Sequence, residues 1–176
     1  KDRDSAPLVA AIKADIHRHH AQMPDHPSLD SLFLGGGTPS LLSAPELAEI
    51  IETANQTFHL KSGAEITIEA NPNDILRSDL QGWKSAGINR VSLGVQSLND
   101  SALNFLGRDH DRANALKAVD AVQAQFDNHS LDFIYARPGQ ILAEWRAELS
   151  AALALGAPHL SLYELTIAER TTFGKR

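Results

Sequence analysis

Residues able to bind a small molecule recur in this sequence wherever a short apolar run gives way to a turn. Polar or glycine-bearing segments follow five such runs: Gly35-Gly36-Gly37-Thr38-Pro39, Glu69-Ala70-Asn71-Pro72, Gln96-Ser97, Arg137-Pro138-Gly139-Gln140 and Tyr163-Glu164-Leu165-Thr166. In parallel barrels, ligand sites collect where strands end and loops begin. If the five runs are parallel strands, their ends converge on one rim and predict a ligand site there.

The three consecutive glycines at positions 35 to 37 would let a strand end approach a ligand closely and expose its backbone donors. A phosphate loop is the competing function, but it needs a helix N-terminus directly after the glycines and usually a lysine. Here the nearest helix start lies downstream at Ser43, and no lysine follows before Lys61. A phosphate loop is therefore disfavoured, and a strand end that needs positive φ is the simpler alternative.

Four polar side chains are candidates for the same rim. Glu69 could bind ribose hydroxyls or an ammonium group, and the amide of Gln96 can both donate and accept. Arg108 follows a glycine and could form a forked pair with a ligand carboxylate. The ordinary alternatives are a solvated side chain for Glu69 and a surface ion pair for Arg108. Asp132 lies within an apolar strand, where an unpaired charge is costly, so it requires a partner or a ligand.

Three histidines, His17, His19 and His20, crowd one predicted helix, and two of them could share a face. No acidic third ligand is fixed nearby, so a solvated helix end is favoured over a metal site. The sequence assigns no metal ligand and no catalytic residue.

Hydrophobic periodicity predicts a helix and then five strands with helices between them. We expect strands at residues 29–34, 65–70, 89–95, 131–135 and 159–165, longer helices at residues 6–20, 43–58, 113–126 and 141–155, and short ones near Leu80 and Leu103. Ser43-Ala44-Pro45-Glu46 is a capping box, and Asn71-Pro72-Asn73-Asp74 reads as a turn. Strands that alternate with helices predict parallel βαβ units in one domain over residues 1–176.

The faces of the strands favour a barrel over an open sheet. Glu65, Thr67 and Glu69 share one face of their strand, while Ile66 and Ile68 share the other, and three further strands divide in the same way. A doubly wound sheet would be apolar on both faces, whereas a polar face suits a wide, ligand-lined interior. We therefore predict an α/β fold that forms a partial, open parallel (β/α) barrel.

Composition restricts the function. The chain has 176 residues, is 43% hydrophobic and carries a net charge of −6, which argues against nucleic acid as a partner because phosphate binding needs a basic patch. Neither a membrane span nor a signal peptide is evident, so we expect a cytoplasmic protein. The chain has no cysteine, which excludes an iron–sulfur cluster held by its own sulfurs.

The sequence begins at Lys1 and stops at Gly174-Lys175-Arg176, and both ends look cut.

Five ordered blocks of sequence resemble one known family: FLGGGTPSLL, ITIEANPN, GINRVSLGVQSLNDSALNFLGRDH, LDFIYARPGQ and PHLSLYELTIAERTTF. Together they are similar to the radical-SAM proteins of the oxygen-independent coproporphyrinogen III oxidase-like family, with the haem-chaperone branch as the better match. The resemblance runs from about Asp30 to Phe173. It implies a barrel of the radical-SAM type.

The resemblance also implies a site for S-adenosylmethionine at the open rim. It assigns Gly36, Gly37 and Thr38 to the methionyl end, and Glu69, Gln96, Arg108 and Asp132 to further contacts. In such proteins a Cys-x3-Cys-x2-Cys loop holds a [4Fe–4S] cluster, whose reduction cleaves the sulfonium and yields a 5′-deoxyadenosyl radical. Oxidases use this radical for porphyrinogen decarboxylation, whereas the chaperone branch is thought to bind haem and pass it to acceptor proteins.

The sequence departs from the family pattern in three ways. The first strand with its cysteine loop is absent, and so is the C-terminal domain, so the cluster is expected only in a longer parent protein and the chain alone is not expected to be catalytic. Ala136-Arg137 replaces a typical Gly-Leu and would bring a bulky charge near the rim. Two alternatives stay open: a haem-binding and delivery module without radical turnover, and a cysteine-free barrel enzyme of unrelated chemistry.

Overall fold

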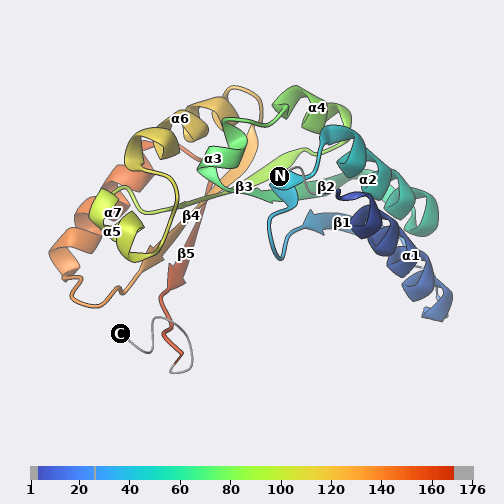
Figure 1. The fold of residues 1–176 in the computed structure, drawn as a ribbon, viewed down its shortest axis with the longest axis horizontal. Coiled ribbons are helices and arrows are strands. Elements are labelled where there is room, and N and C mark those ends of the chain that lie inside the picture. Colours follow the sequence, from blue (N-terminus) through green and yellow to red (C-terminus); the bar gives the residue numbers. More distant parts are fainter. Residues whose placement is uncertain (1–3, 26, 169–176) are drawn as a thin grey trace.

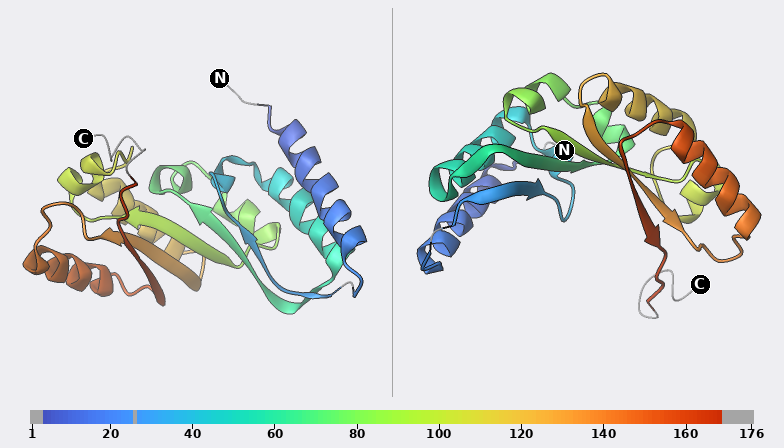
Figure 2. Two further views of the ribbon diagram at one scale, coloured as in Figure 1. Left: turned by 90° about the horizontal axis from the view of Figure 1, so that it is seen from below. Right: turned by 180° about the vertical axis from the view of Figure 1, so that it is seen from behind.

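The fold is a single curved sheet of five parallel strands, seen in a computed structural model that describes residues 4–25 and 27–168. The strands are β1 (Leu29–Leu34), β2 (Leu60–Ala70), β3 (Arg90–Gln96), β4 (Asn128–Tyr135) and β5 (His159–Glu164), and they pair in the order β1-β2-β3-β4-β5. The sheet curls into half a barrel, with its helices along the outer, convex side (Figures 1 and 2). The predicted partial, open parallel barrel is confirmed.

All helices except the first, which precedes β1, lie between successive strands, as parallel pairing requires. The helices are α1 (Ala6–Gln22), α2 (Ala44–Phe58), α3 (Pro72–Ile75), α4 (Leu80–Ser85), α5 (Asp100–Phe105), α6 (Arg112–Gln123) and α7 (Leu142–Ala154), with one 3-10 turn, η1 (Pro39–Leu41). The first helix lies alongside α2 (Figure 1). Among the described residues, no helix has the length and apolar character needed to cross a bilayer.

The division between polar and apolar strand faces is confirmed. Ile68, Val91 and Leu131 are fully buried in the hydrophobic core with Trp83 of α4. Burying an aliphatic side chain of this size contributes roughly 1.5–3 kcal/mol, so this packing holds the helices against the convex face. The opposite face carries the polar residues, and residue pairing places Glu69 of β2 beside Ser92 of β3.

The structure differs from the expected elements mainly at strand starts. Strand β2 begins at Leu60, five residues before the expected start, because Leu60 pairs with Leu29 ahead of a register shift in the β1–β2 ladder. Gly63, with φ of 77°, lies in this irregular stretch. The expected turn after β2 is the one-turn helix α3. Residues 1–3, 26 and 169–176, including both chain ends and the end of the last sequence block, lie outside the described residues.

The predicted capping box is present at the start of α2. Ser43 N donates to Glu46 Oε2 at 2.8 Å, and the Ser43 hydroxyl donates to the same oxygen at 2.6 Å. The hydroxyl of Ser5, just before α1, donates to the other oxygen, Oε1. The hydrogen bonds from Ser43 and Ser5 lower the pKa of the Glu46 carboxyl. One carboxylate therefore joins the starts of two neighbouring helices.

Ala136, directly after β4, adopts a left-handed conformation with φ of 60°. A side chain there costs about 1–2 kcal/mol relative to glycine, and the extra freedom that glycine gains in the unfolded chain offsets about 0.4–1 kcal/mol of this. We expect Ala136→Gly to raise the free energy of unfolding by about 0.5–1 kcal/mol, measured by urea denaturation. As a control, Ala121→Gly within α6 should lower it by about 1 kcal/mol. A destabilised Ala136→Gly variant would contradict the strain.

Candidate functional site

The polar strand ends meet around a cavity of about 440 Å³. This volume lies within the usual range for small-molecule sites, about 300–1,000 Å³. Strands β2 to β5 contribute residues at their ends, whereas β1 contributes only the loop that follows it. The lining residues are Gly37, Thr38, Ser40, Glu69, Ala70, Asn71, Ser92, Gly94, Gln96, Asp132, Ile134 and Tyr163. Five of the seven residues predicted from sequence thus line one cavity, whereas Gly36 and Arg108 do not.

The glycine loop is fixed against Glu69. The backbone N–H of Gly36 donates to Glu69 Oε2 at 3.1 Å, so Gly36 contributes through its backbone although it does not line the cavity. A Cβ atom on Gly35 would lie 2.5 Å from Phe33 Cε1 and 2.9 Å from Glu69 Oε2. Gly36 and Gly37 have φ of 83° and 146°. The loop therefore needs glycine both for close approach and for positive φ.

Asp132 is the most constrained polar residue of the cavity. The Ser92 hydroxyl donates to Asp132 Oδ2 at 2.8 Å, and Ser130 in turn donates to Ser92 at 3.0 Å. The other oxygen, Oδ1, is buried and accepts no hydrogen bond of good geometry from the described residues, although the Ser161 hydroxyl is close enough to lower the pKa of Asp132. Because a buried acceptor without a donor is costly, this oxygen is well suited to accept a hydrogen bond from a ligand.

Burial raises the pKa of Asp132, and the negative charge of Glu69 raises it further. The hydroxyls of Ser92 and Ser161 and the charge of Arg90 act in the opposite direction. The carboxylates of Glu69 and Asp132 line the same cavity and interact electrostatically. Such a pair favours a ligand with ammonium, sulfonium or hydroxyl groups.

Gln96 lies in a strained backbone turn at the end of β3. Its φ is 66°, and Ser97 N donates to Val95 O at 2.8 Å, which closes a three-residue γ-turn around Gln96. Gamma turns with positive φ at the centre are rare and strained. Gly94 leaves room for the amide, because a Cβ atom there would lie 2.7 Å from Gln96 Nε2. The sequence indicated the side chain but carried no signal for this turn.

Arg108 lies after α5, outside the cavity lining. Burial lowers the pKa of its guanidinium, although the nearby Asp109 charge raises it. Its Nε is buried and makes no hydrogen bond among the described residues. A contact between Arg108 and a ligand therefore stays a prediction.

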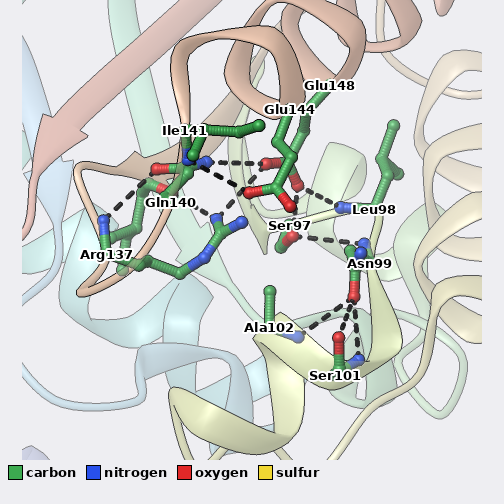
Figure 3. A network of polar contacts seen from close by, with 11 residues as sticks. Ser97, Leu98, Asn99, Ser101, Ala102, Arg137, Gln140, Ile141, Glu144 and Glu148 are labelled. Carbon is green, nitrogen blue, oxygen red and sulfur yellow. Dashed lines mark hydrogen bonds and ion pairs between the residues drawn. The ribbon is translucent and has the colours of Figure 1, made fainter.

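Arg137 lies just after the end of β4, but it does not line the ligand cavity, and its guanidinium pairs with Glu148 instead. Arg137 Nη1 lies 3.2 Å from Glu148 Oε2 and donates to Ile134 O at 3.1 Å. Both side chains line a second cavity of about 580 Å³ between α5 and α7, beside the network drawn in Figure 3. The ion pair is nearly buried, with 11% and 8% of the two side chains exposed.

The histidines of α1 contact α2. His17 Nδ1 lies 3.2 Å from the Thr57 hydroxyl, and the His20 ring packs edge-on against Phe58 at 5.0 Å between centroids.

Sequence reasoning missed Ser92 and Ile134 as lining residues of the ligand cavity. The polar face of β3 was the signal for Ser92, since it places Ser92 two residues before Gly94.

The sequence profile of the Radical SAM superfamily matches residues 11–151, and the chain therefore belongs to this superfamily. Within it, the resemblance to the coproporphyrinogen oxidase-like group and its haem-chaperone branch is confirmed. The chain is 38% identical over 170 residues to "Heme chaperone HemW" of Haemophilus influenzae, covering 96% of this chain and 44% of that protein. It is 41% identical over 148 residues to the Synechocystis protein of the same name, covering 84% of this chain and 36% of that one.

Solved structures agree on the fold. The coproporphyrinogen III oxidase HemN of Escherichia coli, described as a radical SAM enzyme, superposes with a TM-score of 0.81 at 24% identity, covering 99% of this chain and 40% of that one. The chain thus spans less than half the length of the relatives that it matches. Superfamily membership makes S-adenosylmethionine and a [4Fe–4S] cluster the relevant cofactors, and it removes the alternative of a barrel with unrelated chemistry.

Proposed function

We propose that this chain forms the S-adenosylmethionine-binding face of a radical-SAM barrel that acts in porphyrin or haem metabolism. The observation that carries the proposal is the joining of Glu69, Gln96 and Asp132 in one 440 Å³ cavity, next to the glycine loop. Gly36, Gly37 and Thr38 would bind the methionyl end, and Glu69, Gln96, Arg108 and Asp132 would make further contacts.

The residues of the cavity fit such a ligand. Asp132 Oδ1 is a buried acceptor without a partner of good geometry and can accept a hydrogen bond from a ligand hydroxyl or ammonium group. The paired negative charges of Glu69 and Asp132 favour a cationic ligand, and the glycine loop brings backbone groups close to it. S-adenosylmethionine bound beside a reduced [4Fe–4S] cluster would supply radical chemistry, but this chain has no cysteine and so supplies no thiolate for the cluster.

Titration of the isotope-labelled chain with S-adenosylmethionine, followed by NMR, tests the proposal. We expect saturable shifts of the Gln96 side-chain amide and of the Gly36 and Gly37 backbone amides. The double variant Glu69→Ala/Asp132→Ala should abolish these shifts, whereas Lys61→Ala, which removes an exposed ion pair with Asp30, should leave them intact. Absence of any shift around the cavity at millimolar ligand in the wild-type chain would overturn the assignment.

A haem-binding and delivery role without radical turnover is the second candidate, because the two bacterial relatives described above are named heme chaperones. In that case, haem titration should give a Soret shift that saturates at one equivalent, and acceptor proteins would be the partners.

We also place the protein in the cytoplasm. Sequencing the coding DNA upstream of Lys1 tests for the Cys-x3-Cys-x2-Cys loop of a longer parent protein.

A further inference from the structure

The strained turn at Gln96 needs support from its surroundings. A γ-turn with φ of 66° at its centre persists only where neighbouring groups enforce it. Gln96 pairs with Phe133 of β4, but the register of the β3–β4 ladder shifts between Leu93 and Gln96, so regular pairing is interrupted just before the turn. Contacts from outside the ladder therefore add support to the turn.

Glu148 of α7 contacts Ser97, the last residue of the turn, and Leu98, the residue that follows it. The Ser97 hydroxyl and the Leu98 N–H both donate to Glu148 Oε1, the second at 2.9 Å (Figure 3). Ser97 is fully buried, so loss of its acceptor could not be replaced directly by bulk water. Arg137 fixes the carboxylate from the other side through Oε2 at 3.2 Å.

His110 contacts Val95, the first residue of the turn. Its Nε2 lies 3.0 Å from Val95 O, and because a carbonyl oxygen only accepts, this nitrogen is the donor. The imidazole is buried, with the whole residue 5% exposed. Val95 O also accepts the hydrogen bond that closes the turn. The turn is thus fixed on both flanks by groups from outside the strand.

We propose that Glu148 is a positioning residue for ligand binding, acting together with His110 through the backbone on either side of Gln96. Neither residue lines the ligand cavity, so both act indirectly, by keeping the Gln96 amide aimed into it. The inference rests on the proposed function, in which Gln96 contacts the ligand. It extends the site to α7, a helix about fifty residues away in the chain.

Hydrogen exchange without ligand tests the support itself. The variant Glu148→Ala removes both contacts to the turn, and adding Arg137→Met avoids an orphaned guanidinium, so that the double variant keeps a folded core. We expect the Ser97 and Leu98 amides to lose at least tenfold in protection in the double variant. Glu144→Ala is the matched control, because Glu144 lies on the same helix and, among the described residues, accepts a cap hydrogen bond from Ile141 N and none from the turn. Unchanged protection in the double variant would overturn the inference.

Ligand titration of the same variants tests positioning. We expect the dissociation constant for S-adenosylmethionine to rise up to about tenfold in the double variant, since the loss of one hydrogen bond to a ligand costs up to about that factor. Arg137→Met/Glu148→Gln keeps an oxygen acceptor for Ser97 and Leu98 without orphaning a guanidinium, and it should largely restore affinity. Glu144→Ala should retain wild-type affinity. Equal affinity in all variants would contradict positioning, while a wild-type chain that binds no ligand would instead contradict the proposed function.

Discussion

Asp132→Asn is expected to weaken S-adenosylmethionine binding about ten- to hundredfold while making the chain more stable at neutral pH. The loss of affinity follows because a hydrogen bond to a charged acceptor is worth about 1.5–3 kcal/mol. In the variant, an amide group would replace a carboxylate oxygen that accepts no hydrogen bond of good geometry from the described part of the chain. Isothermal titration or NMR titration of both proteins measures the change in affinity.

The gain in stability follows from the raised pKa of Asp132, which is caused mainly by burial. The folded state binds the proton more tightly than the unfolded state, so the wild-type chain loses stability as pH rises from the ordinary aspartate range through the raised value. Asparagine carries no such penalty. Urea denaturation should therefore show Asp132→Asn more stable than wild type by about 0.5–2 kcal/mol at about pH 7, with the difference vanishing near pH 3.

Asp30→Asn is the control for this prediction. Asp30 is exposed and pairs with Lys61 on the surface, so its removal should change stability by less than about 1 kcal/mol and leave affinity unchanged. If Asp132→Asn binds the ligand as tightly as wild type, Asp132 is not a ligand contact. If the free energy of unfolding of Asp132→Asn equals that of wild type at every pH, burial does not destabilise the charged form of Asp132.

The strand faces and the glycine loop could be predicted because they depend on local periodicity and on residue type. Alternation along β2 and β3 separated Ile68 from Glu69, and parallel topology then brought the strand ends together. Asp132 could be predicted for a related reason, since a charge inside an apolar strand requires a partner wherever the strand packs.

The turn at Gln96 and the ion pair of Arg137 could not be predicted, because both depend on tertiary contacts that local sequence patterns do not specify. Positive φ at a glutamine has no sequence signature, and here it depends on contacts with His110 and Glu148. Arg137 pairs with Glu148, which lies on the next helix and offers a nearly buried carboxylate.

Arg137→Met should destabilise this chain strongly, because it leaves Glu148 as an uncompensated, nearly buried charge. Breaking one side of such a pair costs about 3–5 kcal/mol. The hydrogen bonds from Ser97 and Leu98 still solvate the carboxylate, so we expect the lower end, about 3 kcal/mol. For a chain of this length the melting temperature should fall by about 6–12 °C. Urea denaturation and calorimetry measure both quantities.

Two companion variants separate the buried charge from lost packing. Lys61→Met breaks an ion pair at 2.6 Å whose side chains are 55% and 80% exposed, so it should cost less than about 1 kcal/mol. Adding Glu148→Gln to Arg137→Met removes the orphaned charge while keeping an acceptor for Ser97 and Leu98, and should recover at least half of the loss. A double variant as unstable as Arg137→Met alone would mean that Arg137 acts through packing of its side-chain stem, and that the ion pair with Glu148 is not what fixes α7 to the end of β3.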